Sequence, residues 1–369
     1  MGVYAYEICR RLPSLLCSAD IGVTVAVRSE GTDLADQVRS GGGTVTHLTQ
    51  SASSPAIRLY ELYFDLPRRA GQFSCYYTLD HKLPPVALTP RLRVATIHDT
   101  CALDCPHEYG AVRRCYFRRL LPGIVRTADR IVTVSDHAAS RIHHLLGAPR
   151  SQLIVAPNGF DAVQFTHDHH HGEEDALYAA FGIKPGYFLV LGRLSPRKNF
   201  ALIVDAVRRL KGRNQNPMVV LAGPPGWRMS GEWSDLQGGE LRHNFRHIGY
   251  VTPALLPALY RQSSALLYPS RCEGFGIPVL EALACGIPVV VARDTSSEEA
   301  GGGYAISVGA EDADGLAAVI GALTSTRRSA KVDMEGRKQW LERYSWDKTA
   351  GIIASELSRL LRASQVVRH

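Results

Sequence analysis

Several features are missing from the 369-residue chain. It has no stretch of about 18 or more apolar residues, so no membrane-spanning helix is expected. Its N-terminus lacks the basic segment followed by an apolar core that a secretory signal requires. No charge dominates either, because 42 basic and 35 acidic residues leave a net charge of +7. These absences favour a cytoplasmic protein and argue against nucleic-acid binding, while the mild positive charge suits anionic ligands or a membrane surface.

What is present is a globular composition, with 45% hydrophobic and 21% charged residues. A chain of this length can form two domains with separate cores. Apolar strand-like runs alternate with amphipathic helical patterns, which predicts an α/β fold with parallel sheets covered on both faces. The expected strands are residues 23–27, 45–47, 73–77, 94–98, 131–134, 187–191, 218–222, 247–251, 265–268 and 287–292.

The pattern is interrupted once. Residues 166–182 include a run of histidines and acids without periodicity, which we interpret as a linker. The sequence therefore predicts an N-terminal domain of residues 1–165 and a C-terminal domain of residues 183–345. Residues 346–369 form a last amphipathic helix, which we expect to pack back towards the N-terminal domain.

The stretch from Ser270 to Gly286 carries the clearest chemical signal. A strand enters a glycine-punctuated turn containing Glu273, and Pro278 then begins a short helix containing Glu281. The two acids would reach different parts of one elongated ligand, and the helix N-terminus between them suits a phosphate. A nucleotide sugar has this layout, with sugar and ribose hydroxyls on either side of a diphosphate.

A second turn follows the strand 187–191 and carries Arg193, Arg197 and Lys198. Ligands of open α/β sheets bind beyond the carboxyl ends of the strands, so this turn and Glu273 are expected at the same rim. Arg193 and Lys198 would neutralise a diphosphate, whereas we interpret Arg197 as a surface residue. Ser135 can cap the helix that follows it.

Together these residues carry a family resemblance. The segment from Gly192-Arg193 to Lys198-Asn199, the run Glu273-Gly274-Phe275-Gly276, and Glu281 eight residues after Glu273 resemble the signature of glycosyltransferase family 4. These are the retaining GT-B enzymes also called group 1 glycosyl transferases. The resemblance implies two Rossmann-like domains facing across a cleft, with the nucleotide sugar bound mainly by the second domain.

The resemblance also implies roles for matching residues. Arg193 and Lys198 would bind the diphosphate, Glu273 the donor sugar and Glu281 the ribose, while His98 would approach the sugar from the first domain. The implied catalytic residues are His98, Arg193, Lys198 and Glu273. Ser135 resembles a family serine near the cleft, although helix capping explains it equally well. The implied donor-binding residues are Gly2, Arg193, Lys198, Tyr250, Glu273, Gly274, Phe275, Gly276, Ile277 and Glu281.

The mechanism implied by the family is transfer with retention at the anomeric carbon. It requires no cofactor and no metal ion, since Arg193 and Lys198 replace the cation. The only Asp-x-Asp, from Asp312 to Asp314, is better interpreted as a helix cap. Unlike family members, the chain begins at the first helix instead of a strand, and we expect a misassigned start or a truncated product.

The predicted function is transfer of a hexose, mannose from GDP-mannose being preferred, to a glycan or lipid-linked acceptor in polysaccharide biosynthesis. The alternatives are a UDP-sugar-dependent transferase, a GT-B nucleotide-sugar epimerase and an inactive nucleotide-sugar-binding protein. The arginine-rich segment 113–119 could contact the inner face of a membrane peripherally, or could be a solvated helix face.

Overall fold

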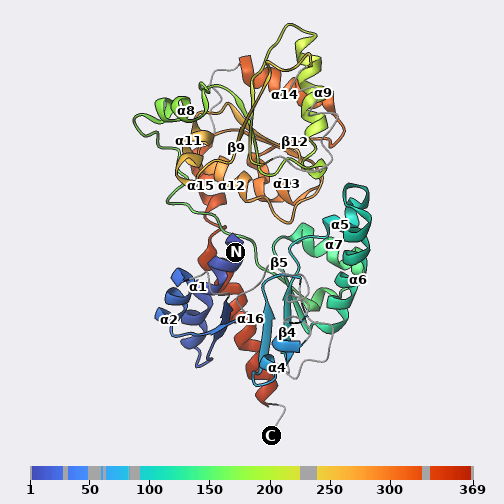
Figure 1. Ribbon diagram of the computed structural model, residues 1–369, viewed down its shortest axis with the longest axis vertical. Helices are drawn as coiled ribbons and strands as arrows, with labels where there is room; N and C mark the ends of the chain where they lie inside the picture. The colour runs from blue at the N-terminus through green and yellow to red at the C-terminus, as the bar shows by residue number, and fades with distance from the viewer. Residues whose placement is uncertain are drawn as a thin grey trace. The chain divides into compact units, whose positions relative to one another are not determined.

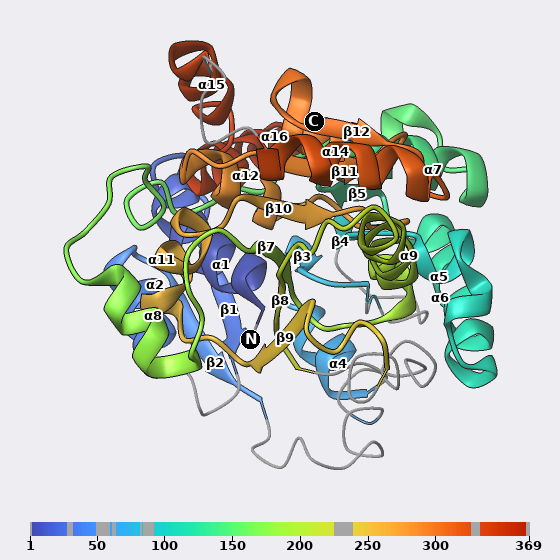
Figure 2. The same ribbon diagram turned by 90° about the horizontal axis from the view of Figure 1, so that it is seen from above.

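The computed structural model describes residues 2–27, 32–48, 60, 64–81, 83, 92–224, 239–325 and 333–366. The chain divides into two compact units (Figures 1 and 2). Unit 1 comprises Met1–Leu103, Tyr109–Gly159 and Tyr344–His369, and unit 2 comprises Asp104–Glu108 and Phe160–Arg343. Within its described part, the chain has no helix of the length and apolar character needed to cross a membrane.

Unit 1 is built on parallel strands. Its elements are α1 (Val3–Cys17), β1 (Thr24–Val27), α2 (Thr32–Ser40), β2 (Thr44–His47), α4 (Leu66–Ala70), β3 (Cys75–Thr78), β4 (Leu92–Thr96), α5 (Cys101–Asp104), α6 (Ala111–Thr127), β5 (Arg130–Thr133), α7 (Asp136–Leu146), η3 (Arg150–Gln152), β6 (Leu153–Val155) and α16 (Trp346–Val366). In the described residues, β1 and β2 form one parallel sheet, and β3, β4, β5 and β6 form another in that order. Helices flank the strands, as in an α/β fold.

The C-terminal helix α16 belongs to unit 1 and packs on α1, as Figure 1 shows. The Arg11 guanidinium donates to the Asp347 carboxylate at 2.6 Å. At Gly159 the backbone passes so close to Trp346 that a β-carbon would clash with the main chain. The turn at residue 159 therefore requires glycine for space.

In the described residues of unit 2, the strands form one six-stranded parallel sheet in the order β12-β11-β10-β7-β8-β9. Its elements are η2 (Pro106–Glu108), α8 (Glu173–Phe181), β7 (Phe188–Leu191), η4 (Pro196–Lys198), α9 (Phe200–Lys211), β8 (Val219–Ala222), β9 (Phe245–Gly249), η5 (Pro253–Leu255), α11 (Leu256–Arg261), β10 (Ala265–Tyr268), α12 (Ile277–Ala284), β11 (Val289–Ala292), α13 (Ser296–Gly301), η6 (Gly302–Tyr304), β12 (Ile306–Val308), α14 (Ala313–Ser325) and α15 (Met334–Leu341).

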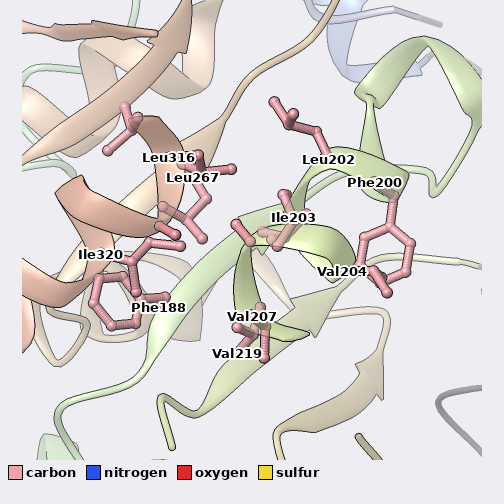
Figure 3. Close-up of a cluster of buried hydrophobic side chains, with 14 of the residues drawn as sticks. Phe188, Phe200, Leu202, Ile203, Val204, Val207, Val219, Leu267, Leu316 and Ile320 are labelled. Atoms are coloured by element: carbon pink, nitrogen blue, oxygen red, sulfur yellow. The ribbon is translucent and has the colours of Figure 1, made fainter. Parts of the chain in front are cut away.

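The four central strands of this sheet are apolar on both faces, as expected where helices cover both. Helices α9 and α14 pack side by side over one face. Figure 3 shows the resulting core, in which Phe188 of β7 lies beside Ile320 of α14. Four strands, β7, β8, β10 and β11, are nearly continuous runs of buried residues, as expected for a covered parallel sheet. This rigid sheet positions the loops that follow its strands.

Several local predictions can be compared with the structure. The first helix expected from the sequence is α1, Val3–Cys17. Ser135 is confirmed as a cap, since its hydroxyl accepts from the Ala138 N–H at 2.9 Å. Residues 173–181 of the predicted linker form the helix α8, which begins after Gly172 at a φ of 82°. Three acids in its first turn favour that helix through its dipole.

Candidate active site

Two neighbouring strands bring the predicted cationic and acidic residues together. Strands β7 and β10 pair in parallel, so their carboxyl ends lie at the same edge of the sheet. The loop after β7 carries Lys198, and the loop after β10 carries Glu273. The N–H of Arg271 donates to the carbonyl of Arg197 at 2.8 Å, which joins the two loops directly.

Lys198 and Glu273 form a buried ion pair, with 2.7 Å between Nζ and Oε1. The Lys198 ammonium also donates to the Tyr268 hydroxyl at 2.7 Å. Burial alone would raise the pKa of Glu273, but Lys198 and Arg197 outweigh it and lower this pKa to about 2. Burial lowers the pKa of Lys198, and Glu273 opposes that effect. The Glu273 carboxylate is therefore ionised at neutral pH and offers a fixed acceptor, with the Lys198 side chain held against it.

The prediction that Arg197 faces the solvent is wrong. Its guanidinium donates to Glu273 Oε2, and to the Cys272 carbonyl at 3.1 Å. Its side chain is 30% exposed. The 3₁₀ turn η4 places Arg197 and Lys198 in succession, and Glu273 has two carboxylate oxygens to receive them. Arg193, in contrast, is exposed on the same loop.

The turn after Glu273 is constrained by its surroundings. Gly276 has a φ of 126°, and a β-carbon there would lie 3.2 Å from Ser297 Cα. Glycine is therefore needed both for conformation and for space. Helix α12 begins at Ile277 without a side-chain cap, Pro278 has no N–H, and the Val279 N–H donates to the Gly276 carbonyl at 2.9 Å. Phe275 is buried beneath this turn.

Ser296 is a contributor that the sequence did not indicate. Its hydroxyl donates to the Glu273 carbonyl at 2.8 Å and so fixes the backbone of the acidic turn. Ser296 begins α13 just after β11, and β11 is the neighbour of β10 on the side away from β7. Ser296 follows a strand at the same edge of the sheet as Glu273. This position is evident only when the order of the strands is known.

Glu281 lies one turn into α12 and accepts a hydrogen bond from the Tyr260 hydroxyl at 2.7 Å. Burial raises its pKa to about 7. Tyr250 follows β9 after Gly249, whose φ is 70°, and its side chain is 72% exposed. The strand order β10-β7-β8-β9 therefore puts Tyr250 at the far end of the row of loops from Glu273.

Two of the predicted site residues, His98 and Gly2, belong to unit 1. His98 follows β4, and its Nε2 lies 3.0 Å from the Leu79 carbonyl oxygen. The Tyr4 ring packs edge-on to the imidazole, with 4.6 Å between ring centroids. Gly2 is exposed and precedes α1. The remaining predicted site residues, from Arg193 to Glu281, lie in unit 2.

The aspartates of the Asp-x-Asp motif have a structural role. The Asp312 carboxylate accepts from the Gly315 N–H at 2.8 Å, at the start of α14. The interpretation of Asp312 as a helix cap is confirmed. Asp314, one residue inside the helix, pairs with Arg209 of α9.

Two family models match the chain. The model described as glycosyltransferase family 4 matches residues 1–164, and the model described as glycosyl transferases group 1 matches residues 179–338. The chain is 30% identical over 230 residues to the O-antigen chain mannosyltransferase B of Escherichia coli, covering 62% of this chain and 60% of the relative. The chain thus spans about three fifths of that relative's length.

Another relative is the GDP-mannose-dependent alpha-(1-6)-phosphatidylinositol monomannoside mannosyltransferase of Mycolicibacterium smegmatis. It is 28% identical over 297 residues, which is 76% of each chain. Among solved structures, Anabaena Alr3699/HepE in complex with UDP and glucose superposes with a TM-score of 0.71 at 18% identity, over 96% of each chain. With its two Rossmann-like units, the chain has the GT-B fold.

Proposed function

The chain belongs to the family 4, or group 1, glycosyltransferases, and from this premise we propose that it transfers a hexose from a nucleotide-diphosphate sugar to a glycan or lipid-linked acceptor. The observation that carries the proposal is the buried Lys198–Glu273 pair at the ends of β7 and β10. Such a pair combines a cation for phosphate with an acceptor for sugar hydroxyls. The start of α12, which no side chain caps, follows Glu273 on the same loop.

In this proposal, Lys198 and Arg193 bind the diphosphate. Glu273 accepts hydrogen bonds from the donor sugar, and the backbone of Phe275, Gly276 and Ile277 completes its subsite. Glu281 accepts from the ribose, and Tyr250 borders the base. Fixed positive charge beside the leaving diphosphate stabilises the charge that develops there, so the cationic side chains take the place of a metal ion.

The reaction itself would proceed with retention. The bond between the anomeric carbon and the phosphate oxygen breaks, and its electron pair passes to that oxygen. The acceptor hydroxyl oxygen forms the new bond on the same face of the sugar. Its proton passes to the departing phosphate, so no separate base is needed. His98 would contact the donor sugar near the anomeric centre.

For the donor we propose GDP-mannose. The names of two relatives support this, one being a mannosyltransferase and the other a GDP-mannose-dependent mannosyltransferase. The acceptor would be a growing polysaccharide or a lipid-linked glycan.

Donor turnover separates this function from its rivals. GDP-mannose and UDP-sugars are incubated with the protein, with and without EDTA, and products are followed by NMR. Released sugar of unchanged anomeric configuration supports a transferase, and an interconverted sugar nucleotide supports an epimerase. Binding without turnover supports an inactive binding protein, and turnover of UDP-sugars alone would replace the donor we propose.

A matched pair of variants tests the site. Lys198→Ala removes the buried cation and is expected to lower turnover by about 10²–10³, as for the loss of one fixed charge-stabilising group. Lys211→Ala removes an ammonium at the end of α9 that contacts Glu240, and should leave turnover unchanged. Wild-type turnover in Lys198→Ala would refute the assignment.

We also infer that α6 contacts an anionic membrane. Its arginines at 113, 118, 119 and 126 are exposed, and the neighbouring Val112 and Tyr116 are 86% and 47% exposed. Basic and apolar side chains together on one helix suit a lipid surface. Sedimentation with vesicles containing anionic lipid should show salt-sensitive binding, and its absence would leave α6 as a solvated face.

A further inference from the structure

Tyr260 lies beneath Glu281 in unit 2 and is fully buried. Its hydroxyl donates to Oε2 of Glu281 at 2.7 Å, which joins α11 to α12. The edge of the Phe165 ring meets the Tyr260 ring at 5.8 Å between centroids. The hydroxyl of Tyr187, which precedes β7, donates to the neighbouring Leu259 carbonyl at 2.7 Å and makes no hydrogen bond to Tyr260 or Glu281 among the described residues. The hydroxyl of Tyr260 is thus presented to Glu281 by a ring that is buried and packed against Phe165.

The two oxygens of Glu281 differ in their surroundings. Oε2 receives the Tyr260 hydroxyl, whereas no described residue donates a hydrogen bond to Oε1. A carboxylate held by one oxygen has its rotation restricted and keeps the other oxygen for an outside donor. This arrangement matches what a ligand hydroxyl needs.

We propose that Tyr260 is the positioning residue of Glu281, holding its carboxylate so that Oε1 accepts from the ribose hydroxyls of the donor. The inference rests on the proposed function, because it takes Glu281 as the ribose acceptor. Tyr260 itself is too deeply placed to touch the ligand and acts only through Glu281.

The charges around Glu281 give Tyr260 a second effect. Burial raises the pKa of Glu281 to about 7, the Tyr260 hydrogen bond opposes the rise, and the Asp161 carboxylate adds to it. The other titratable groups facing Glu281 are Tyr268 of β10 and Cys285 at the end of α12. Burial raises the pKa of both, so they are neutral at pH 7, and among these groups Tyr260 alone favours the carboxylate. Without Tyr260, more of Glu281 would be protonated near neutral pH.

Tyr187 provides a matched control for Tyr260. It is also a buried tyrosine whose hydroxyl makes a 2.7 Å hydrogen bond in the same part of unit 2, but its partner is a backbone carbonyl. Tyr260→Phe and Tyr187→Phe each remove one buried hydroxyl and keep the ring. A merely structural role for Tyr260 would therefore give the two variants the same behaviour in every measurement.

The experiment is a titration with GDP and UDP between pH 6 and pH 9, by calorimetry, of the wild type, Tyr260→Phe, Tyr187→Phe and Glu281→Gln. The 2′,3′-dideoxy forms of both nucleotides are titrated in parallel. Wild-type affinity for the ribose form should fall as the pH drops through about 7. In Tyr260→Phe the midpoint should move up by about one pH unit, which lowers affinity about fivefold at pH 7 and hardly at all at pH 9.

Two further results are expected. The dideoxy nucleotides should bind wild type and Tyr260→Phe equally, and Tyr187→Phe should keep the wild-type midpoint while melting at a lower temperature. The positioning role would be overturned if the pH midpoint of nucleotide binding were the same in Tyr260→Phe and Tyr187→Phe. It would also be overturned if Tyr260→Phe lost as much affinity for the dideoxy nucleotides as for the ribose forms. If the wild type binds neither nucleotide, or Glu281→Gln still discriminates ribose from dideoxyribose, the proposed function of the site fails instead.

Discussion

The pKa of Glu281 predicts that unit 2 loses stability as the pH rises. Burial raises this pKa from 4.5 to about 7, so the folded state binds the proton more tightly than the unfolded state. The resulting stabilisation is fully present below pH 4.5 and is lost as the pH rises through 7. At 1.36 kcal/mol per pH unit, the full effect is about 3 kcal/mol. Between pH 5.5 and 8.5, about 2 kcal/mol of it should disappear.

Glu281→Gln isolates this effect, because glutamine retains the size of the side chain and does not titrate. The free energy of unfolding is measured in urea at pH 5.5 and pH 8.5 for the wild type and for the variant. The wild type should lose about 2 kcal/mol more than the variant between the two pH values. Glu174→Gln, an exposed glutamate in α8, should behave like the wild type. Equal pH dependence in wild type and Glu281→Gln would refute the reasoning.

Three other changes should lower stability, each followed by urea unfolding. Arg261→Met leaves the buried Glu173 carboxylate without its guanidinium and should cost about 3–5 kcal/mol, whereas the double change with Glu173→Leu should recover much of this. Gly223 has a φ of 135°, and in Gly223→Ala the new β-carbon would lie against the Gly192 carbonyl. This change should lower the free energy of unfolding by more than about 1–3 kcal/mol, and in the extreme case the variant would not fold. Ser135→Ala removes the cap of α7 and should cost about 1 kcal/mol, and no change would mean that the hydrogen bond to Ala138 contributes nothing.

Much of the fold could be predicted from the sequence because the strands of a covered parallel sheet are apolar on both faces. Strand β10 and its neighbour β11 were recognisable in this way. Strand ends were less certain: the run predicted at 94–98 is a strand from Leu92 to Thr96. Helix α8 was missed because its residues look like a polar linker, and only the acids of its first turn indicate a helix start.

Candidate site residues could be proposed from the sequence where the residue type itself suggests chemistry, but their neighbours could not be predicted where packing decides them. The order of loops along the rim follows from strand order, which no local pattern reveals. That order explains why Ser296 contacts Glu273 and why Tyr250 lies far from it. The partners of Glu281 and Lys198 are tyrosines, Tyr260 and Tyr268, whose sequence positions look like ordinary core.

The inward orientation of Arg197 changes the charge balance of the site. Arg193, Arg197 and Lys198 are three cations on one loop, and Glu273 supplies one carboxylate, which leaves two positive charges. A diphosphate in a nucleotide sugar carries about two negative charges, so the proposed donor would neutralise the loop. Arg197 occupies one oxygen of Glu273 before the donor arrives, and sugar hydroxyls would have to share or displace it. Because like charges on one loop repel each other, donor binding should relieve this repulsion, and the gain is largest when the salt concentration is low. The sequence alone suggested only Arg193 and Lys198 as cations beside Glu273. Their net single positive charge would have neutralised only half of the charge of the diphosphate.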